Sequence, residues 1–241
     1  MMNVECAKIK RTGFGWIFLA GGAFGAALPV LNTAFRTELF LDKALRQSSV
    51  RVLMEANWQM SAMINLLLVI LGAAILYHIE YAGNGILRMD ALPVRPMKLF
   101  GNKLVLLVSF FLFSVILEMA GMLVCLYVWF LPETECMLEL GRYVSSEVML
   151  MLPVTVLMLA VSSVCRNMWV TLGIGVTGIF FATIMMNASF WISLVPFSMP
   201  FKLLPGMERG TVIKYGTAAA AETAVFLAVS HVLQNRRRDA S

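Results

Sequence analysis

Long apolar runs separated by short polar stretches make up most of the chain. A hydrocarbon core about 30 Å thick takes roughly 20 helical residues, and each run is close to that length. The runs are continuously apolar and lack the two-residue alternation of barrel strands, so they predict helices. We therefore expect an all-α membrane protein, with one transmembrane domain over residues 1–241. Its six predicted spans are about 14–31, 58–78, 104–130, 143–164, 168–186 and 211–233.

Four other stretches flank or connect these spans. Residues 1–12 form a short basic lead-in that we expect to lie amphipathically on the membrane surface. Residues 32–57 mix charged and apolar side chains at helical spacing and predict an amphipathic helix on the outer surface. Residues 80–103 are the polar connection between the second and third spans. Residues 187–210 combine aromatic side chains with prolines, and predict a re-entrant or interfacial external segment.

The composition supports a bilayer environment. The chain is 60% hydrophobic and 14% charged, with mean hydropathy +0.81, whereas a soluble domain is about 45–50% apolar. The net charge of +5 does not indicate nucleic acid, because the cations lie at the ends of apolar runs and not on a solvated face. We expect the lipid bilayer to be the protein's environment and no nucleic acid to be a partner.

The distribution of lysine and arginine predicts cytoplasmic termini. In this orientation, cytoplasmic segments hold eleven of the 19 basic residues and all of the concentrated clusters. The eleven are Lys8, Lys10, Arg11, Arg88, Arg95, Lys98, Lys103, Arg166, Arg236, Arg237 and Arg238.

Motifs for cofactor chemistry are missing from the sequence. The four cysteines show no C-x-x-C spacing, so no zinc site or disulfide framework is supported. The G-x-G-x-x-G at residues 173–178 lies inside a predicted span and predicts helix packing, because a dinucleotide site needs that motif between a strand and a helix. No phosphate-binding G-x-x-x-x-G-K-[ST] occurs. We expect no catalytic residue, metal or directly bound cofactor.

Two groups of residues are candidates for substrate contact. Glu118 and Glu222 lie within apolar runs, where an ionisable group is costly and marks a functional candidate. The alternative explanation for both is a hydrogen bond to a neighbouring helix or, for Glu118, a position near the membrane interface once the span tilts. The external segment holds Phe190, Trp191, Phe197 and Phe201, which form either a gate for an amphipathic ligand or an interfacial anchor.

Two stretches carry a resemblance to a known family. One is the lead-in E-x-x-K-x-K-R-T at residues 5–12, and the other is the segment 80–103 with its Leu92-Pro93-Val94-x-Pro core. Together with the six-span layout, they resemble the permease subunits of type 2 ABC exporters, most closely the small lantibiotic-immunity permeases. The resemblance implies that residues 80–103 form a cytoplasmic coupling helix that docks on a separate ATPase. The residues that match the family pattern are Glu80, Gly83, Leu92, Pro93, Val94 and Lys103.

The coupling segment also has suitable chemistry for docking. Ile86, Leu87 and Met89 provide an apolar surface to bury against a partner, and Arg88 and Asp90 provide charges to orient it. The resemblance implies two ATPase subunits that bind ATP and Mg²⁺, and a second permease, identical or a sister subunit. It predicts export of a lantibiotic-like peptide from the bacterial plasma membrane. The alternatives are export of a lipid or drug, or a non-transporting structural or sensory partner of an ATPase.

Overall fold

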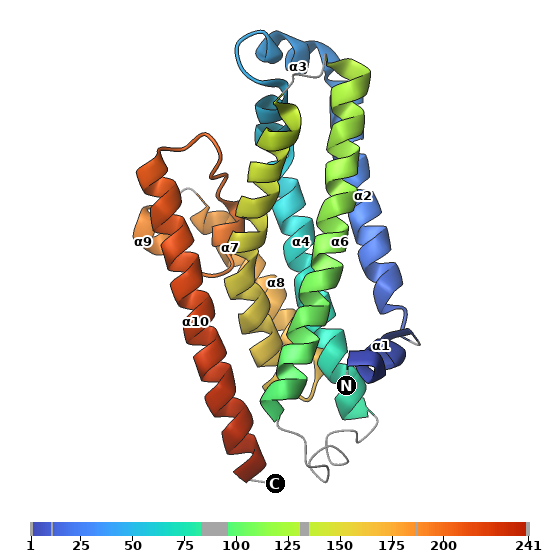
Figure 1. Ribbon diagram of the computed structural model, residues 1–241, viewed down its shortest axis with the longest axis vertical. Coiled ribbons are helices and arrows are strands. Elements are labelled where there is room, and N and C mark those ends of the chain that lie inside the picture. Colours follow the sequence, from blue (N-terminus) through green and yellow to red (C-terminus); the bar gives the residue numbers. More distant parts are fainter. Residues whose placement is uncertain (1, 11, 83–95, 131–134, 187, 240–241) are drawn as a thin grey trace.

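The computed structural model describes residues 2–10, 12–82, 96–130, 135–186 and 188–239, and these residues form helices joined by turns (Figure 1). Among these described residues, six helices are long and apolar enough to cross a membrane, which confirms the predicted number of spans. They are α2 (Phe14–Phe35), α4 (Ser49–Ala82), α6 (Pro96–Trp129), α7 (Cys136–Val164), α8 (Met168–Met185) and α10 (Arg209–Asp239). The shorter helices are α1 (Met2–Lys10), α3 (Thr37–Ala44), α9 (Phe190–Ser193) and η1 (Met199–Phe201).

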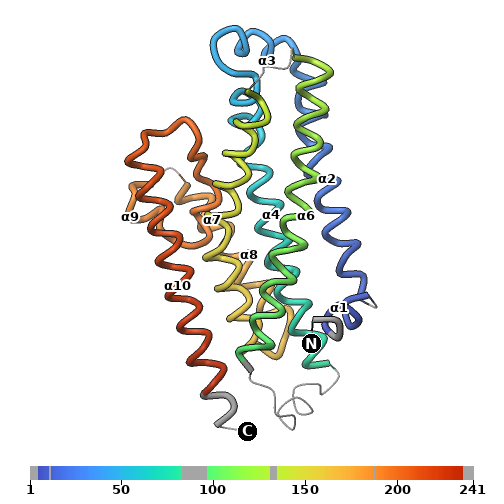
Figure 2. Tube along the Cα trace, viewed as in Figure 1, coloured from blue at the N-terminus to red at the C-terminus, as the bar shows by residue number. Residues whose placement is uncertain are grey.

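Both termini lie at the same end of the helix bundle, as an even number of spans requires (Figure 2). We call this the basal end. It also holds α1, the last turn of α4 and the first turn of α6, whereas α3 caps the opposite, distal end (Figure 1). The side of the membrane that the basal end faces stays a prediction from the distribution of basic residues.

Five spans are longer than predicted, and one interpretation was wrong. Residues 32–57 do not form a single amphipathic surface helix: α2 continues to Phe35, α3 takes eight residues, and α4 begins at Ser49. Of the charges that suggested a surface helix, only Arg51 and Glu55 lie on α4, where Arg51 Nε is 2.8 Å from Glu55 Oε1. The other side of this turn is apolar and buried, so the helix continues straight into the membrane-spanning part.

The starts of α6 and α7 also precede the predicted boundaries. The third span was expected from residue 104, but α6 begins at Pro96, a residue that suits the first turn of a helix because it has no N–H to leave unpaired. Likewise α7 begins at Cys136 and not at residue 143. Polar residues at these helix ends made the spans look shorter than they are.

Helices α4 and α7 form the centre of the bundle, and α8 and α10 lie at its edge. In the most apolar window of α4 and of α7, 61% of residues are buried, against 22% for α8 and 11% for α10. The lead-in, predicted to lie on the membrane surface, forms α1 and directs Glu5 and Ile9 into the bundle. The outward faces of α8 and α10 are left for lipid or for a partner.

Small residues let α2 and α6 approach closely. A Cβ at Gly22 would lie 3.0 Å from Ser114 Cα, and a Cβ at Gly121 would collide with the backbone of Ala26. The glycine motif of α8 also serves packing, since Gly175 faces Ile70 and Gly178 faces Phe197. This confirms that the motif at residues 173–178 serves helix packing.

We expect Gly121→Ala to destabilise the protein, because its methyl group meets backbone that cannot rotate away. Overpacking of this kind costs about 1–3 kcal/mol. Gly173→Ala is the matched control, since a Cβ there meets nothing within 4 Å and alanine favours helix. Thermal unfolding in detergent micelles should place Gly121→Ala below the wild type and Gly173→Ala at or above it. Equal unfolding temperatures for the two variants would contradict the packing of α2 on α6.

Candidate functional site

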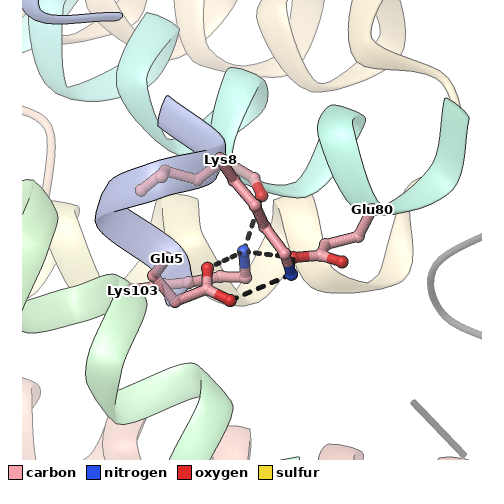
Figure 3. A network of polar contacts seen from close by, with 5 residues as sticks. Glu5, Lys8, Glu80 and Lys103 are labelled. Atoms are coloured by element: carbon pink, nitrogen blue, oxygen red, sulfur yellow. Dashed lines mark hydrogen bonds and ion pairs between the residues drawn. The ribbon is translucent and has the colours of Figure 1, made fainter. Parts of the chain in front are cut away.

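Four charged side chains from three helices meet at the basal end (Figure 3). Glu5 and Lys8 come from α1, Glu80 from α4 and Lys103 from α6. The Lys8 ammonium lies 3.1 Å from Glu5 Oε1 and 2.8 Å from Glu80 Oε1. The Lys103 ammonium lies 2.9 Å from Glu5 Oε2 and 3.0 Å from Glu80 Oε1. Each carboxylate therefore contacts both lysines, which makes a closed ring of alternating charge that we call the ionic ring.

Most of the ionic ring is buried. The side chains of Lys103, Glu80 and Glu5 are only 2%, 3% and 5% exposed, and that of Lys8 is 28% exposed. Lys103 also donates a hydrogen bond to the Leu76 carbonyl oxygen at 2.9 Å and lies 5.4 Å from the centre of the Tyr77 ring. Buried charges are tolerated only when they are paired and hydrogen-bonded. The ring meets that condition and holds α1 against α4 and α6.

The ionic ring shifts the protonation of the two α1 residues. Burial disfavours the charged form of Glu5, but the charge and hydrogen bond of Lys103, helped by Lys8, outweigh it and lower the pKa of Glu5 below its ordinary value. Burial likewise opposes the charged form of Lys8, and hydrogen bonds to Glu80 and Glu5 outweigh it and raise the pKa of Lys8. Both residues therefore stay charged over a wider pH range than in an unfolded chain.

Two of the predicted coupling residues, Glu80 and Lys103, belong to the ionic ring. Glu80 and Lys103 are buried in the helices on either side of the coupling segment, so their side chains hold the flanks of that segment and present no surface to a partner. The remaining predicted coupling residues lie outside the described part of the chain, and their role stays a prediction. They are Gly83, Ile86, Leu87, Arg88, Met89, Leu92, Pro93 and Val94.

A second polar cluster lies in the apolar core. The Asn65 side-chain amide donates to Glu118 Oε2 at 3.0 Å and to Glu147 Oε1 at 2.7 Å, which joins α4, α6 and α7. We call these three residues the carboxyl pair and its amide. Glu118 was a predicted candidate, but Asn65 and Glu147 were missed. The same signal, a polar side chain inside an apolar span, was present for both of them.

Glu222 does not join Glu118, although the sequence suggested both as candidates. It lies on α10, partly exposed, and its Oε2 atom has no hydrogen-bond partner. No hydrogen bond between described residues connects it to the ionic ring or to the carboxyl pair. The substrate role predicted for Glu118 and Glu222 is not decided by this geometry.

The external aromatic residues separate into two groups. Phe197 and Phe201 are buried, at 8% and 5% exposure, and the segment is fixed to α4 by a hydrogen bond from Trp58 Nε1 to the Pro200 carbonyl oxygen at 3.1 Å. Phe190 packs edge-on against Tyr215 of α10, and Trp191 is 79% exposed. Two of the four predicted gate residues therefore pack inside, and Trp191 alone among the four is fully available to a ligand or to lipid.

The distal end also contains a large cavity between α7, α10 and the loop before α10. Its volume is about 1050 Å³, and it is lined by both apolar and charged side chains. These include Met149, Leu204, Glu139, Arg142 and Arg209. The mixed lining suits a ligand that is itself amphipathic.

Comparison with protein families gives a direct result. The family model described as ABC-2 family transporter protein matches residues 1–182, which include the ionic ring and the carboxyl pair. The chain belongs to the ABC-2 transporter family. This ABC-2 permease is thus a multi-pass membrane subunit of a transporter, located in the plasma membrane in bacteria, and the family in general works with an ABC ATPase. Searches of curated proteins and of solved structures give no significant match.

We expect Lys103→Gln to destabilise the permease strongly, because it leaves two buried carboxylates with one ammonium. Breaking a buried ion pair by removing one partner costs about 3–5 kcal/mol. Lys98→Gln, an exposed lysine on the same helix, is the matched control and should cost less than about 0.5 kcal/mol. Thermal unfolding of the purified variants measures the difference. The double variant Glu80→Gln/Lys103→Gln should lose less than the sum of its parts, and strict additivity would show that the two residues do not interact.

The docking of α1 should depend on pH at both extremes. The lowered pKa of Glu5 gives stability that is complete above its unfolded value of about 4.3 and is lost as pH falls through the folded value. The raised pKa of Lys8 gives stability that is complete below about 10.4 and is lost as pH rises through the folded value. In unfolding experiments between about pH 3 and pH 8, wild type should exceed Glu5→Gln at neutral pH and converge with it in acid. If the difference in stability between wild type and Glu5→Gln stays the same from pH 8 to pH 3, the charge of Glu5 is not what stabilises the docking of α1.

Proposed function

We propose that this ABC-2 permease is the membrane subunit of an ATP-driven exporter that removes an amphipathic, lantibiotic-like peptide from the bacterial plasma membrane. Two ATPase subunits bind ATP and Mg²⁺ and contact the coupling segment, residues 80–103. A second permease, identical or a sister subunit, completes the transporter. The permease itself performs no chemistry on ATP and contributes the path for the substrate.

The observation that carries the proposal is the ionic ring. It ties the last turns of α4 and the first turns of α6 to α1, at the two points where the coupling segment enters and leaves the bundle. A displacement of that segment by an ATPase therefore moves three helices together. Because α4 has 34 residues and reaches from the basal to the distal end, a tilt at its base also displaces its distal end.

The distal cavity supports an amphipathic substrate. Its charged residues are of both signs, two acidic and two basic, and Met149 and Leu204 provide apolar surface. The charged residues are Glu135, Glu139, Arg142 and Arg209. Ligand sites typically combine apolar lining with a few polar groups that fix orientation. The exposed Trp191 lies on the segment that connects α8 to α10, where an apolar side chain of a membrane-bound peptide can meet it.

Cells with and without this permease and its ATPase, exposed to a panel of membrane-active peptides, provide the test of substrate class. We expect protection against cationic amphipathic peptides of the lantibiotic type and no change with small hydrophobic drugs. Protection against drugs alone would identify a drug as the substrate. Altered lipid distribution without protection against peptides would identify a lipid. No protection against any compound, with the transporter present in the membrane, would contradict export.

Charge reversal in the coupling segment tests how the energy is delivered. Arg88→Glu should abolish peptide protection while the permease still inserts and its spans remain folded, because the contact with the ATPase is lost. Lys98→Glu, at an exposed position in the first turn of α6 and not among the predicted coupling residues, is the matched control and should retain protection. Membrane fractions are probed for both permease and ATPase. Full protection by Arg88→Glu would show that this segment is not where the ATPase acts.

A further inference from the structure

Two glutamates face each other across one amide in the apolar core. Glu118 of α6 and Glu147 of α7 both accept hydrogen bonds from the same side-chain nitrogen of Asn65, at 3.0 Å and 2.7 Å. The exposed fractions of the three residues are 1%, 2% and 0%. Each residue lies about three turns or more from the end of its helix, so water outside the bundle does not reach the group.

The cluster has more hydrogen-bond acceptors than donors. The two carboxyl groups and the amide present five oxygens, and the Asn65 amide is the donor for both carboxyls. Two of the oxygens, Asn65 Oδ1 and Glu118 Oε1, are buried without a partner. Buried acceptors are nearly always paired in folded proteins, so two orphans at one place indicate a missing donor.

Among the described residues, no cation offsets these two carboxyl groups. Helix α2, which packs against Glu118, carries no charged side chain. On α4, α6 and α7 the other charged groups lie toward the helix ends, and the charged group in the middle of α10, Glu222, is itself a carboxyl group. Arg51, Glu55, Glu139 and Arg142 lie toward the distal end, and Glu80 and Lys103 lie toward the basal end.

Elementary electrostatics determines how such a pair is stable. An isolated carboxylate in an apolar interior is strongly disfavoured, and two facing carboxylates repel each other as well. Two carboxyl groups that share a site solve both problems when they hold one proton between them. The proton also supplies a donor where the orphaned oxygens lack one.

We propose that Glu118 and Glu147 form a proton-binding site, which holds one proton per permease in the middle of the bundle with Asn65 as its bridge. This site requires only the buried geometry and does not rest on the peptide substrate or on the ATPase contact proposed above.

The site is closed by close helix contact, which links the proton to the conformation of the bundle. A Cβ at Gly25 of α2 would lie 2.6 Å from Glu118 Oε1, so the carboxyl group fits only because that residue is glycine. The three side chains come from α4, α6 and α7. Any movement that separates α6 from α4 and α7 breaks the amide bridge and opens the site. The proton then leaves or enters only when these helices move apart.

Infrared spectroscopy of the full-length permease detects the proton directly. The protein is labelled with ¹³C in the glutamate carboxyl groups and placed in nanodiscs of ether-linked lipids, which contain no ester carbonyl. A neutral carboxyl group has a C=O stretching band that an ionised carboxylate lacks, and exposed glutamates are ionised at neutral pH. We expect one neutral glutamate from this pair in the wild type at neutral pH.

Variants assign the band and keep the test independent of folding defects. Glu222→Gln, which removes the partly exposed glutamate of α10, is the matched control and should retain the band. Glu118→Gln/Glu147→Gln should lose it. If Glu222→Gln protein has no neutral glutamate band at neutral pH, both members of the pair are ionised and the proposal is overturned, whether or not the double variant folds. A band that appears only after sodium is replaced by choline would identify a sodium ion in place of the proton and would also overturn it.

Discussion

A buried ammonium group, that of Lys103, determines how the basal end of this permease is built. In an apolar environment this charge requires opposite charges nearby, and the sequence provides one on α4 and one on α1. Lys8 then balances the second carboxylate, and the four charges close into the ionic ring. Electrostatic neutrality thus links an N-terminal helix to two spans and keeps both flanks of the coupling segment in fixed positions.

The same constraint has a different outcome in the core. The carboxyl pair has an amide in place of lysines, so its hydrogen bonds are fewer than its acceptors. In the ionic ring every charged group is paired, so the three helices that contribute to it are held firmly together. The carboxyl pair, in contrast, leaves two buried oxygen acceptors without a hydrogen-bond partner, which is costly in an apolar interior.

The spans could be predicted from the sequence because apolar length is a strong and local signal. Their boundaries were less accurate where charged residues at a helix end pair with each other, as Arg51 and Glu55 do, or where a lysine is buried by distant partners, as Lys103 is. The residues in the ionic ring were visible as the lead-in and the coupling segment, but their meeting depends on contacts between positions up to 98 residues apart. Glu147 and Asn65 carry the same signal as Glu118, a polar side chain inside an apolar span, but their meeting depends on the packing of three helices, which the sequence does not show.

The separation between Glu5 and Lys103 bears on how the protein is made. Helix α1 carries Glu5, which is synthesised 98 residues before its partner Lys103 on α6. Its contact with Lys103 therefore forms only after α6 has been synthesised, although Lys8 can meet Glu80 as soon as α4 is present. Biogenesis of the basal end is complete only when the third span arrives, so a chain released from the ribosome before that point leaves Glu5 and Glu80 without their shared lysine.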